Sequence, residues 1–198
     1  MQTLLPDIEM WSWPSPAHGY PFNGHLLRLP GLVLVVDPVE PDAETLAALV
    51  AARPSRILLT NRNHTRAAQR LRELTGARIA LHPADTAHAQ QQGVSIDDPL
   101  HAGESIGPLR LVDLSGKSAG ELGLHWPERR ILLVGDALIG DPPGRCRLLR
   151  PQVIDDLARL QASVRRALEL DFDTLLVGDG APILHDARAR VAELVATF

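Results

Sequence analysis

Short apolar runs alternate with amphipathic stretches along most of the chain. The residues Leu32–Val36 form a continuous apolar run, and a largely apolar run, Leu26–Leu29, precedes it. Pro30 and Gly31 separate the two runs and favour a tight turn. This pattern predicts a β-hairpin whose second strand is buried on both faces.

After this hairpin the pattern switches between the periods of a helix and of a strand. It predicts helices at about 42–53, 66–75 and 83–91, and strands at about 56–60 and 77–81. Asp42 suits the N-cap of the first helix and Gly76 the C-terminal cap of the second. Residues 1–22 are rich in Trp and Pro, so we expect an irregular segment. Its indoles, Trp11 and Trp13, either form an exposed binding surface or pack over an edge of the core.

The second half of the chain repeats this alternation of strands and helices. Strands are expected at 109–114, 121–126, 130–134 and 173–177, and helices at 154–168 and 187–195. No linker-like stretch interrupts the pattern. We therefore expect a single α/β domain over residues 1–198, built from two similar halves that are β-rich and covered by helices.

Polar side chains follow several of the expected strands. They are found at Asp37, Asn61–Arg66, Ser115–Ser118, Asp136 and Asp179. Loops that follow strands are where α/β proteins place ligand chemistry. The loop before the helix at 66–75 holds most of these side chains, so it is the expected centre of a site.

The order and spacing of these segments resemble the metallo-β-lactamase superfamily from about Asn23 to the C-terminus. The segments that match are Val35–Pro38, Leu58–Ala68, Leu114–Gly120, Leu132–Asp136 and Gly178–Gly180. The resemblance implies a four-layer αβ/βα sandwich with its site at one edge of the two sheets. It also implies hydrolytic ancestry.

The metal-binding pattern of that family is altered in this chain. The family carries His-x-His-x-Asp-His after a threonine, and the matching ligand positions here are Asn61, Asn63, Thr65 and Arg66. His64 stands at a spacer position, so it does not count as a retained ligand.

The later ligand positions of the family are altered as well. Its Gly-His loop has Lys117 in place of the histidine, and its final histidine is Asp179 here. Among the seven ligand positions only Asp136 keeps the residue type of the family. Asp179 retains a carboxylate that could coordinate a metal in principle.

These replacements change the chemistry that the site can support. Zinc sites need three or four nitrogen, sulfur or carboxylate ligands, whereas amides bind zinc poorly and fixed cations repel it. We therefore expect no metal cofactor. We also expect Arg66 and Lys117 to pair with Asp136 and Asp179, because buried carboxylates need partners.

Several of these residues could still take part in a reaction. His64 is the candidate general base, and Asp136 could orient it or the attacking water. Asp179 is the third candidate catalytic residue. The side chains that could hold a carboxylate, phosphate or oxyanion are Asn61, Asn63, Arg66 and Lys117. The alternatives are structural: His64 caps a helix or points to solvent, Asp136 forms a salt bridge, and the two asparagines stabilise Asx turns.

Composition excludes some classes of protein. The 198 residues include 20 basic and 24 acidic residues, a net charge of −4, which argues against a general binder of nucleic acid or anionic membranes. Cys146 is the only cysteine, so neither an internal disulfide nor a Cys-based zinc site is expected. No apolar run is long enough to cross a bilayer, and a cytoplasmic location is the default.

Two classes of function stay open from the sequence. One is a residual hydrolase that works without metal or with a reduced site at Asp136 and Asp179. The other is a non-catalytic protein that binds a small anionic ligand, or a partner, in the same place. The substrate and the oligomeric state do not follow from the sequence.

Overall fold

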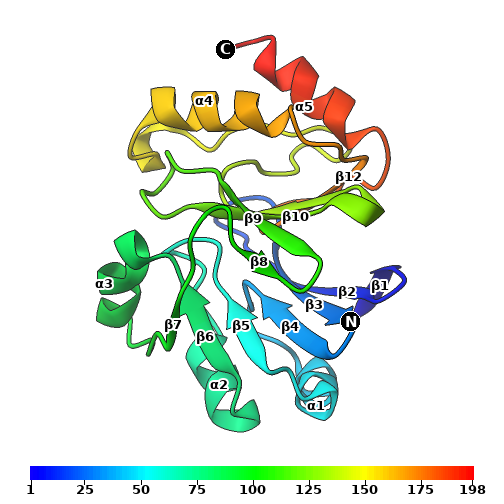
Figure 1. The fold of residues 1–198 in the computed structure, drawn as a ribbon, viewed down its shortest axis with the longest axis vertical. Helices are drawn as coiled ribbons and strands as arrows, with labels where there is room; N and C mark the ends of the chain where they lie inside the picture. Colours follow the sequence, from blue (N-terminus) through cyan, green and yellow to red (C-terminus); the bar gives the residue numbers. More distant parts are fainter. The chain divides into compact units, whose positions relative to one another are not determined.

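The computed structural model describes residues 1–198 (Figure 1). These residues form two compact units, Met1–Leu100 and His101–Phe198. In the first unit seven strands form one sheet in the order of the sequence. These strands are β1 (Gln2–Leu5), β2 (Ile8–Trp13), β3 (Phe22–Leu29), β4 (Leu32–Val36), β5 (Arg56–Leu58), β6 (Arg78–Leu81) and β7 (Asp98–Pro99). The strands are antiparallel from β1 to β4 and parallel from β4 to β7.

Helices connect the parallel strands of the first unit, as crossover connections require. They are α1 (Ala43–Ala52), α2 (Ala68–Thr75) and α3 (Pro83–Gln91). Asp42 caps α1 by accepting a hydrogen bond from the Thr45 N–H at 2.7 Å, and Gly76 ends α2 with φ +74°. Leu49 of α1 and Leu71 of α2 join the same apolar cluster as alternate residues of β3 to β6, so both helices pack on one face of the sheet (Figure 1).

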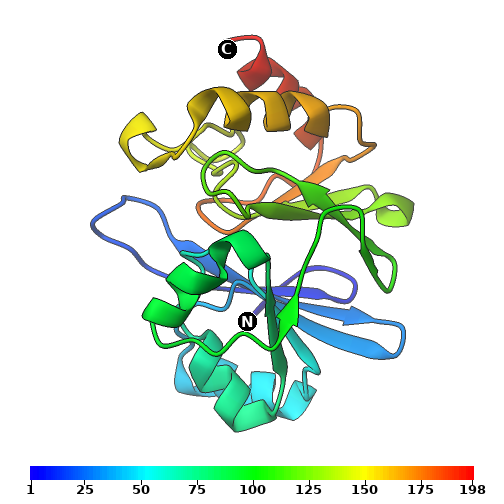
Figure 2. The same cartoon turned by 60° about the vertical axis from the view of Figure 1, so that its left-hand side comes forward.

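The second unit contains a five-stranded sheet in the order β12-β11-β10-β9-β8. Its strands are β8 (Ser105–Ile106), β9 (Leu109–Asp113), β10 (Leu122–Trp126), β11 (Ile131–Val134) and β12 (Thr174–Val177). Only β11 and β12 are parallel. The helices α4 (Leu157–Ala167) and α5 (Ala187–Val195) lie over one face of this sheet, where Leu160, Val164 and Val191 pack against β11 and β12 (Figure 2).

The N-terminal segment corrects one prediction. Residues 1–22 were expected to be irregular, but they contain β1 and β2, and β2 pairs with β3 along its whole length. Trp11 lies against Gly24 of β3, where a Cβ atom would stand 2.4 Å from the indole. The Trp11 Nε1–H donates to the Val39 carbonyl at 2.9 Å. Trp11 therefore packs into the core, as one of the two alternatives proposed, whereas Trp13 at the end of β2 is 42% exposed.

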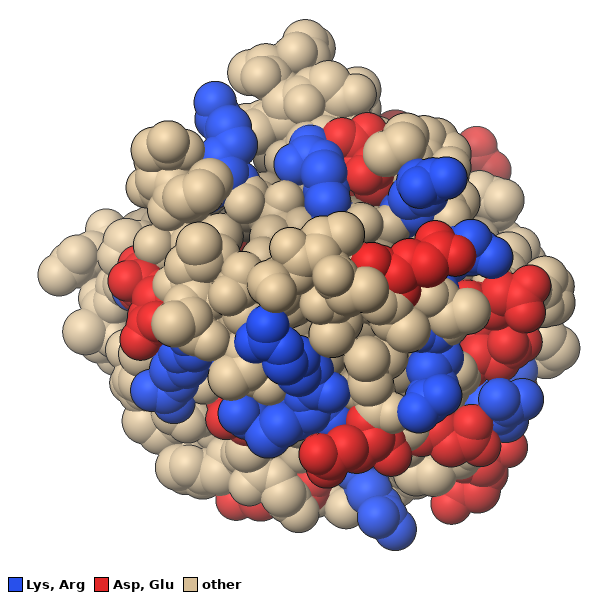
Figure 3. All heavy atoms as spheres, turned by 90° about the horizontal axis from the view of Figure 1, so that it is seen from above, with Lys and Arg blue, Asp and Glu red and all other residues tan.

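The other expected helices and strands are present with small shifts of their ends. β5 ends at Leu58 and α4 begins at Leu157, while the short strands β7 and β8 lie within and at the end of the expected loop at 92–105. None of the helices has the length and apolar character that a membrane span requires. On the face over α4 and α5, basic and acidic side chains are interspersed (Figure 3).

Candidate functional site

In the first unit the loop after β5 is attached to the end of β4 by Asp37. Both carboxylate oxygens of this residue are used: the Thr60 N–H donates to Oδ1 at 2.8 Å, and the Thr60 hydroxyl donates to Oδ2 at 2.6 Å. Asp37 is fully buried and has φ +48°. Because β4 and β5 are parallel neighbours, their carboxyl ends meet at one edge, and Asp37 joins the two loops there.

His64 is held by the same carboxylate. Its Nδ1 lies 2.7 Å from Asp37 Oδ2 and 3.2 Å from Thr60 Oγ1, and the His64 side chain is fully buried. His64 therefore does not point to solvent, and it does not cap α2, whose N-cap is Ala67. In the tautomer in which Nδ1 carries the proton and donates a hydrogen bond to Asp37, Nε2 is the basic nitrogen of the ring.

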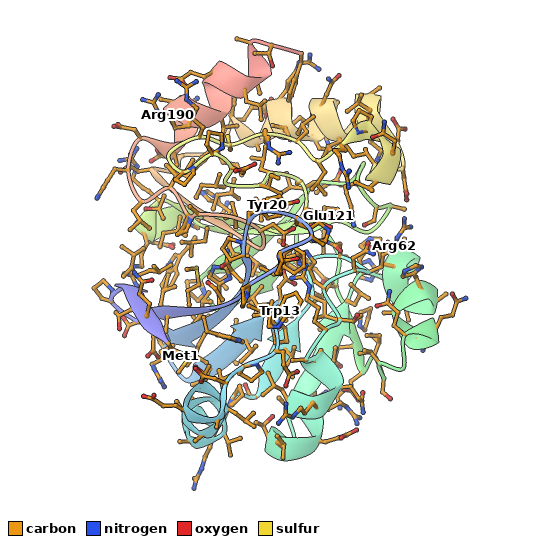
Figure 4. The ribbon with its side chains drawn as sticks, turned by 180° about the vertical axis from the view of Figure 1, so that it is seen from behind. Met1, Trp13, Tyr20, Arg62, Glu121 and Arg190 are labelled. Atoms are coloured by element: carbon orange, nitrogen blue, oxygen red, sulfur yellow. The ribbon has the colours of Figure 1, made fainter.

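The two asparagines of this loop differ in exposure. Asn61 is buried, and its Oδ1 accepts a hydrogen bond from the Asn63 N–H at 2.8 Å. This hydrogen bond forms an Asx turn, which was the structural role proposed for Asn61 as the alternative to ligand binding. Asn63 is exposed. The N–H of Arg62, a residue labelled in Figure 4, donates to the buried carboxylate of Asp85 in α3 at 2.9 Å.

Arg66 ends the polar part of the loop and is half-buried. Its guanidinium carbon lies 4.1 Å from the centroid of the Phe22 ring. This cation–π contact anchors the side chain within the first unit. Arg66 and Phe22 also line a cavity of about 300 Å³, together with Trp13, Val39 and Glu40.

His25 is a further histidine of the first unit, and its environment did not follow from the sequence. It lies in β3, is fully buried, and neither of its ring nitrogens forms a hydrogen bond. Burial lowers the pKa of His25 to about 4; the Asp37 carboxylate raises this pKa and His64 lowers it. His25 is therefore neutral at pH 7, and Asp37 and His64 are close enough for their charges to affect its pKa.

In the second unit Lys117 forms a buried ion pair with Asp136. The Nζ atom lies 2.5 Å from Asp136 Oδ2, and the two side chains are 6% and 7% exposed. The pairing of this lysine with this aspartate was predicted from the sequence, and it is confirmed. The expected pairing of Arg66 with one of the aspartates stays a prediction.

The loop that carries Lys117 is fixed by α4. Gly116 has φ +141°, and a Cβ atom there would stand 2.2 Å from the Leu160 backbone nitrogen. The Asp156 N–H donates to the Gly116 carbonyl at 2.8 Å, and the Ser163 hydroxyl donates to the Ser115 carbonyl at 2.8 Å. Only glycine permits this close approach to α4, so the loop is held against the helix directly before Lys117.

Asp136 is held from its backbone by Glu121, a residue that the sequence analysis did not single out. The Glu121 Oε1 accepts hydrogen bonds from the N–H groups of Asp136 at 2.8 Å and Ala137 at 3.2 Å. Glu121 is fully buried (labelled in Figure 4). Its position before β10 gives no sequence signal, because the contact depends on the pairing of β10 with β11.

Asp179 follows β12 and is tied to the loop after Asp136. The Gly140 N–H donates to the Asp179 carbonyl at 2.9 Å, and the Ala181 N–H donates to the Gly140 carbonyl at 2.8 Å. A Cβ on Gly140 would stand 1.9 Å from the Ala181 oxygen, so the two loops touch through their backbones. The carboxylates of Asp136 and Asp179 each present an oxygen within 4.8 Å of the other.

Comparison with known proteins identifies the class. The profile of the metallo-beta-lactamase superfamily matches residues 1–198, and the chain belongs to this superfamily of metallo-β-lactamase-fold hydrolases. Two hydroxyacylglutathione hydrolases from strains of Cereibacter sphaeroides are 30% identical to it over 145 residues. These residues make up 70% of this chain and 55% of each relative, so the chain spans about half the length of these curated relatives.

Solved structures share the fold. A metallo-beta-lactamase family protein from Thermus thermophilus has a TM-score of 0.74 and 23% identity, covering 98% of this chain and 80% of its own. A metallo-beta-lactamase from Erythrobacter litoralis has a TM-score of 0.78 and 21% identity, covering 100% of this chain and 96% of its own. The predicted fold class is thereby confirmed: each unit supplies one sheet and one helix layer of the expected αβ/βα arrangement.

Proposed function

We propose that this chain is a hydrolase-like member of the superfamily whose metal site is degenerate and which works without a metal ion. The ion pair between Lys117 and Asp136 carries the proposal. Asp136 matches the one ligand position that keeps the family's residue type, and an ammonium group lies 2.5 Å from its carboxylate. A fixed cation at that distance repels a divalent metal and satisfies the carboxylate in its place.

The donors at the other matching positions in the first unit do not fit a zinc centre either. Asn61 uses its amide oxygen in the turn with Asn63, and Asn63 is exposed. Arg66 supplies a cation that lies against Phe22. Amides and a guanidinium cannot replace imidazole and carboxylate ligands. The protein's own positive charge therefore stands where the family has metal charge.

Hydrolysis without metal would rest, in the first unit, on His64 and Asp37. His64, with Nδ1 held by Asp37 at 2.7 Å, has the arrangement of a general base that takes a proton from water at Nε2. The reaction would be the hydrolysis of an ester or thioester.

The second candidate is a binding protein for a small anionic ligand. One observation favours it: Arg66 lines a cavity of the first unit together with the exposed indole of Trp13. Such a protein needs a cation and a surface for the ligand but no base. Stabilisation by anionic metabolites that is lost in Arg66→Ala, with no turnover, would support this candidate.

Metal content tests the first proposal directly. Protein purified without chelator is analysed for zinc, iron and manganese by mass spectrometry, alongside Asp136→Ala and Asp171→Ala. Asp171 is a matched control in the same unit, with a side chain that is 70% exposed. We expect far less than one equivalent of metal in all three proteins. About one equivalent that disappears in Asp136→Ala but not in Asp171→Ala would sink the proposal.

Activity tests separate the two candidates. Ester and thioester panels are run on the parent chain, His64→Ala and Asp136→Ala. Turnover that is lost in both variants supports the residual hydrolase. Absence of turnover across the panels, together with ligand stabilisation, supports the binding protein.

A further inference from the structure

Three of the four edge strands in the two sheets are protected against pairing with another chain. β7 and β8 have only two residues each, and β7 consists of an aspartate and a proline, Asp98–Pro99. The edge of β12 is covered, because Leu175 and Ile183 exchange backbone hydrogen bonds of 2.8 and 2.9 Å. Short edge strands, charges, prolines and covering segments are the means by which proteins keep an edge from pairing.

The fourth edge strand, β1, lacks these features. It has four residues, Gln2–Leu5, none of which is charged or a proline, and it pairs only with β2 (Figure 1). No other backbone hydrogen bond reaches β1. Its register with β2 shifts between Thr3 and Leu5, so Gln2 and Thr3 form the regular end of the edge. This end is open to pairing with an additional strand.

A cavity of about 550 Å³ adjoins the regular end of β1, and its volume is within the range of ligand sites. Met1 and Gln2 line it together with residues of β2 and of the segment before α1. Its apolar lining includes Met10, Trp11 and Trp13; Met1 and Trp13 are labelled in Figure 4. Trp13 is 42% exposed, and methionine side chains adapt to different partners. An extended chain beside β1 could therefore place an apolar side chain in this cavity.

The charges of the cavity favour a basic partner. The charged side chains that line it are Glu40 and Asp42, and no lysine or arginine lines it. Hydrogen bonds from Thr45 lower the pKa of Asp42, and the N-terminal ammonium group acts in the same direction, so Asp42 is ionised at neutral pH. Glu40 pairs with Arg70 of α2, but both side chains are about half exposed, and such surface pairs are weak. Each carboxylate has acceptor capacity for a further cation.

We propose that the edge of β1 and this cavity bind an extended peptide segment that carries both apolar and basic side chains. The backbone of the segment would pair with β1 as an additional strand. An apolar side chain would contact Trp13, and a lysine or arginine would bind Asp42 or Glu40. The inference goes beyond the proposed function, because neither His64 nor the matching metal-ligand positions take part.

Fluorescence anisotropy with a labelled peptide of about seven residues tests the inference. Lysine and valine alternate at every second position of this peptide, with threonine between them, so that both side chains lie on the same face of a strand. One control peptide has methylated backbone nitrogens, which keeps the side chains but removes the donors for strand pairing. A second control has glutamate in place of lysine. We expect each control to bind at least about tenfold more weakly than the lysine peptide.

Variants of the protein locate the binding site. Trp13→Ala, and the double variant Glu40→Gln with Asp42→Asn, should each weaken binding of the lysine peptide by about tenfold or more. Asparagine is also a good N-cap residue, so Asp42→Asn preserves the start of α1. Asp171→Asn removes an exposed carboxylate of the second unit and should bind like the parent chain. Thermal unfolding establishes that each variant is folded before binding is compared.

Several results would overturn the inference. Equal binding of the methylated peptide would exclude pairing with β1, and equal binding of the glutamate peptide would exclude recognition by the two carboxylates. Unchanged binding in Trp13→Ala would place the peptide outside this cavity. Failure of the lysine peptide to bind would remove the inference altogether. The metal content of the protein does not enter these comparisons, so each result is independent of the proposed metal-free site.

Discussion

Two loops that follow buried strands, one in each unit, hold a carboxylate against a basic side chain in different ways. In the first unit Asp37 contacts His64 at 2.7 Å and also accepts two hydrogen bonds from Thr60. In the second unit Asp136 contacts Lys117 at 2.5 Å. The first pair contains an imidazole, whose ring nitrogens can accept or donate a proton, whereas the second pair joins an ammonium group to a carboxylate.

The carboxylates are anchored differently too. The carboxylate of Asp37 joins two loops, because it accepts hydrogen bonds from Thr60 as well as contacting His64. Asp136 is held from its backbone by Glu121, and its carboxylate forms an ion pair with Lys117.

Breaking the pair in the second unit should have the largest effect. Lys117→Met leaves the Asp136 carboxylate buried without its cation, so we expect a loss of about 3–5 kcal/mol in the free energy of unfolding, measured by denaturant titration. Arg130→Met removes an exposed pair with Asp171 and should cost less than about 1 kcal/mol. Equal losses in the two variants would show that the Lys117 pair is not a buried interaction.

A pH titration should reveal the polar cluster of the first unit. The pKa of His25 is lowered from 6.5 to about 4 in the folded chain, so the unfolded state binds more protons between these values. Stability is therefore highest above pH 6.5 and falls as the pH drops towards 4, by on the order of 3 kcal/mol. In His25→Leu this part of the loss should vanish.

The control for the pH titration is His185→Leu, because the His185 side chain is 85% exposed. It should keep the pH dependence of the parent chain. Parallel stability curves for the parent chain and His25→Leu between pH 4 and 6.5 would contradict the assignment to His25.

Asp37→Asn should lower the free energy of unfolding by less than Lys117→Met does, and by less than the pH-dependent loss assigned to His25. The amide keeps the size of the side chain but gives up the charged hydrogen bonds to Thr60 and His64, so we expect a loss of about 2 kcal/mol. Thr60→Val removes only the hydroxyl bond and should cost about 1 kcal/mol. If an esterase activity is found, Asp37→Asn should lower kcat and shift its pH profile, because it releases His64 Nδ1; an unchanged profile would restrict Asp37 to a structural role.

The sequence predicted one of these pairs and not the other, for a physical reason. Lys117 and Asp136 both match metal-ligand positions of the superfamily. Because ligands of one metal centre lie close together, an ion pair between these two side chains could be predicted. The Asp37–His64 pair joins residues at the ends of neighbouring parallel strands, and their contact depends on a register that apolar periodicity does not specify. The Asx turn at Asn61 was weighed as an alternative because its partner is only two residues away.

For the fold too, the sequence predicted what local patterns specify and missed what depends on strand pairing. Elements with clear periodicity, such as β4 and α1, were predicted closely because burial alone dictates them. β2 was missed because the prolines after it suggested an irregular segment, although Ile8 and Met10 point to the core in alternation with Glu9. Its pairing with β3 decides its structure, and the position of Trp13 follows from it.

The smallest effect is expected outside both loops, at an ion pair that lies near the surface. Arg72 lies 2.9 Å from Asp97, and its hydrogen bonds lower the pKa of Asp97 from 3.8 to about 2. This carboxylate therefore stabilises the fold above pH 3.8, and that contribution is lost as the pH falls through about 2. Asp97→Asn should be less stable than the parent chain at pH 7, by less than Lys117→Met, and the difference should narrow towards pH 2. If Asp97→Asn lowered the free energy of unfolding at pH 7 as much as Lys117→Met does, the buried pair of Lys117 and Asp136 would contribute no more than the pair of Arg72 and Asp97 near the surface.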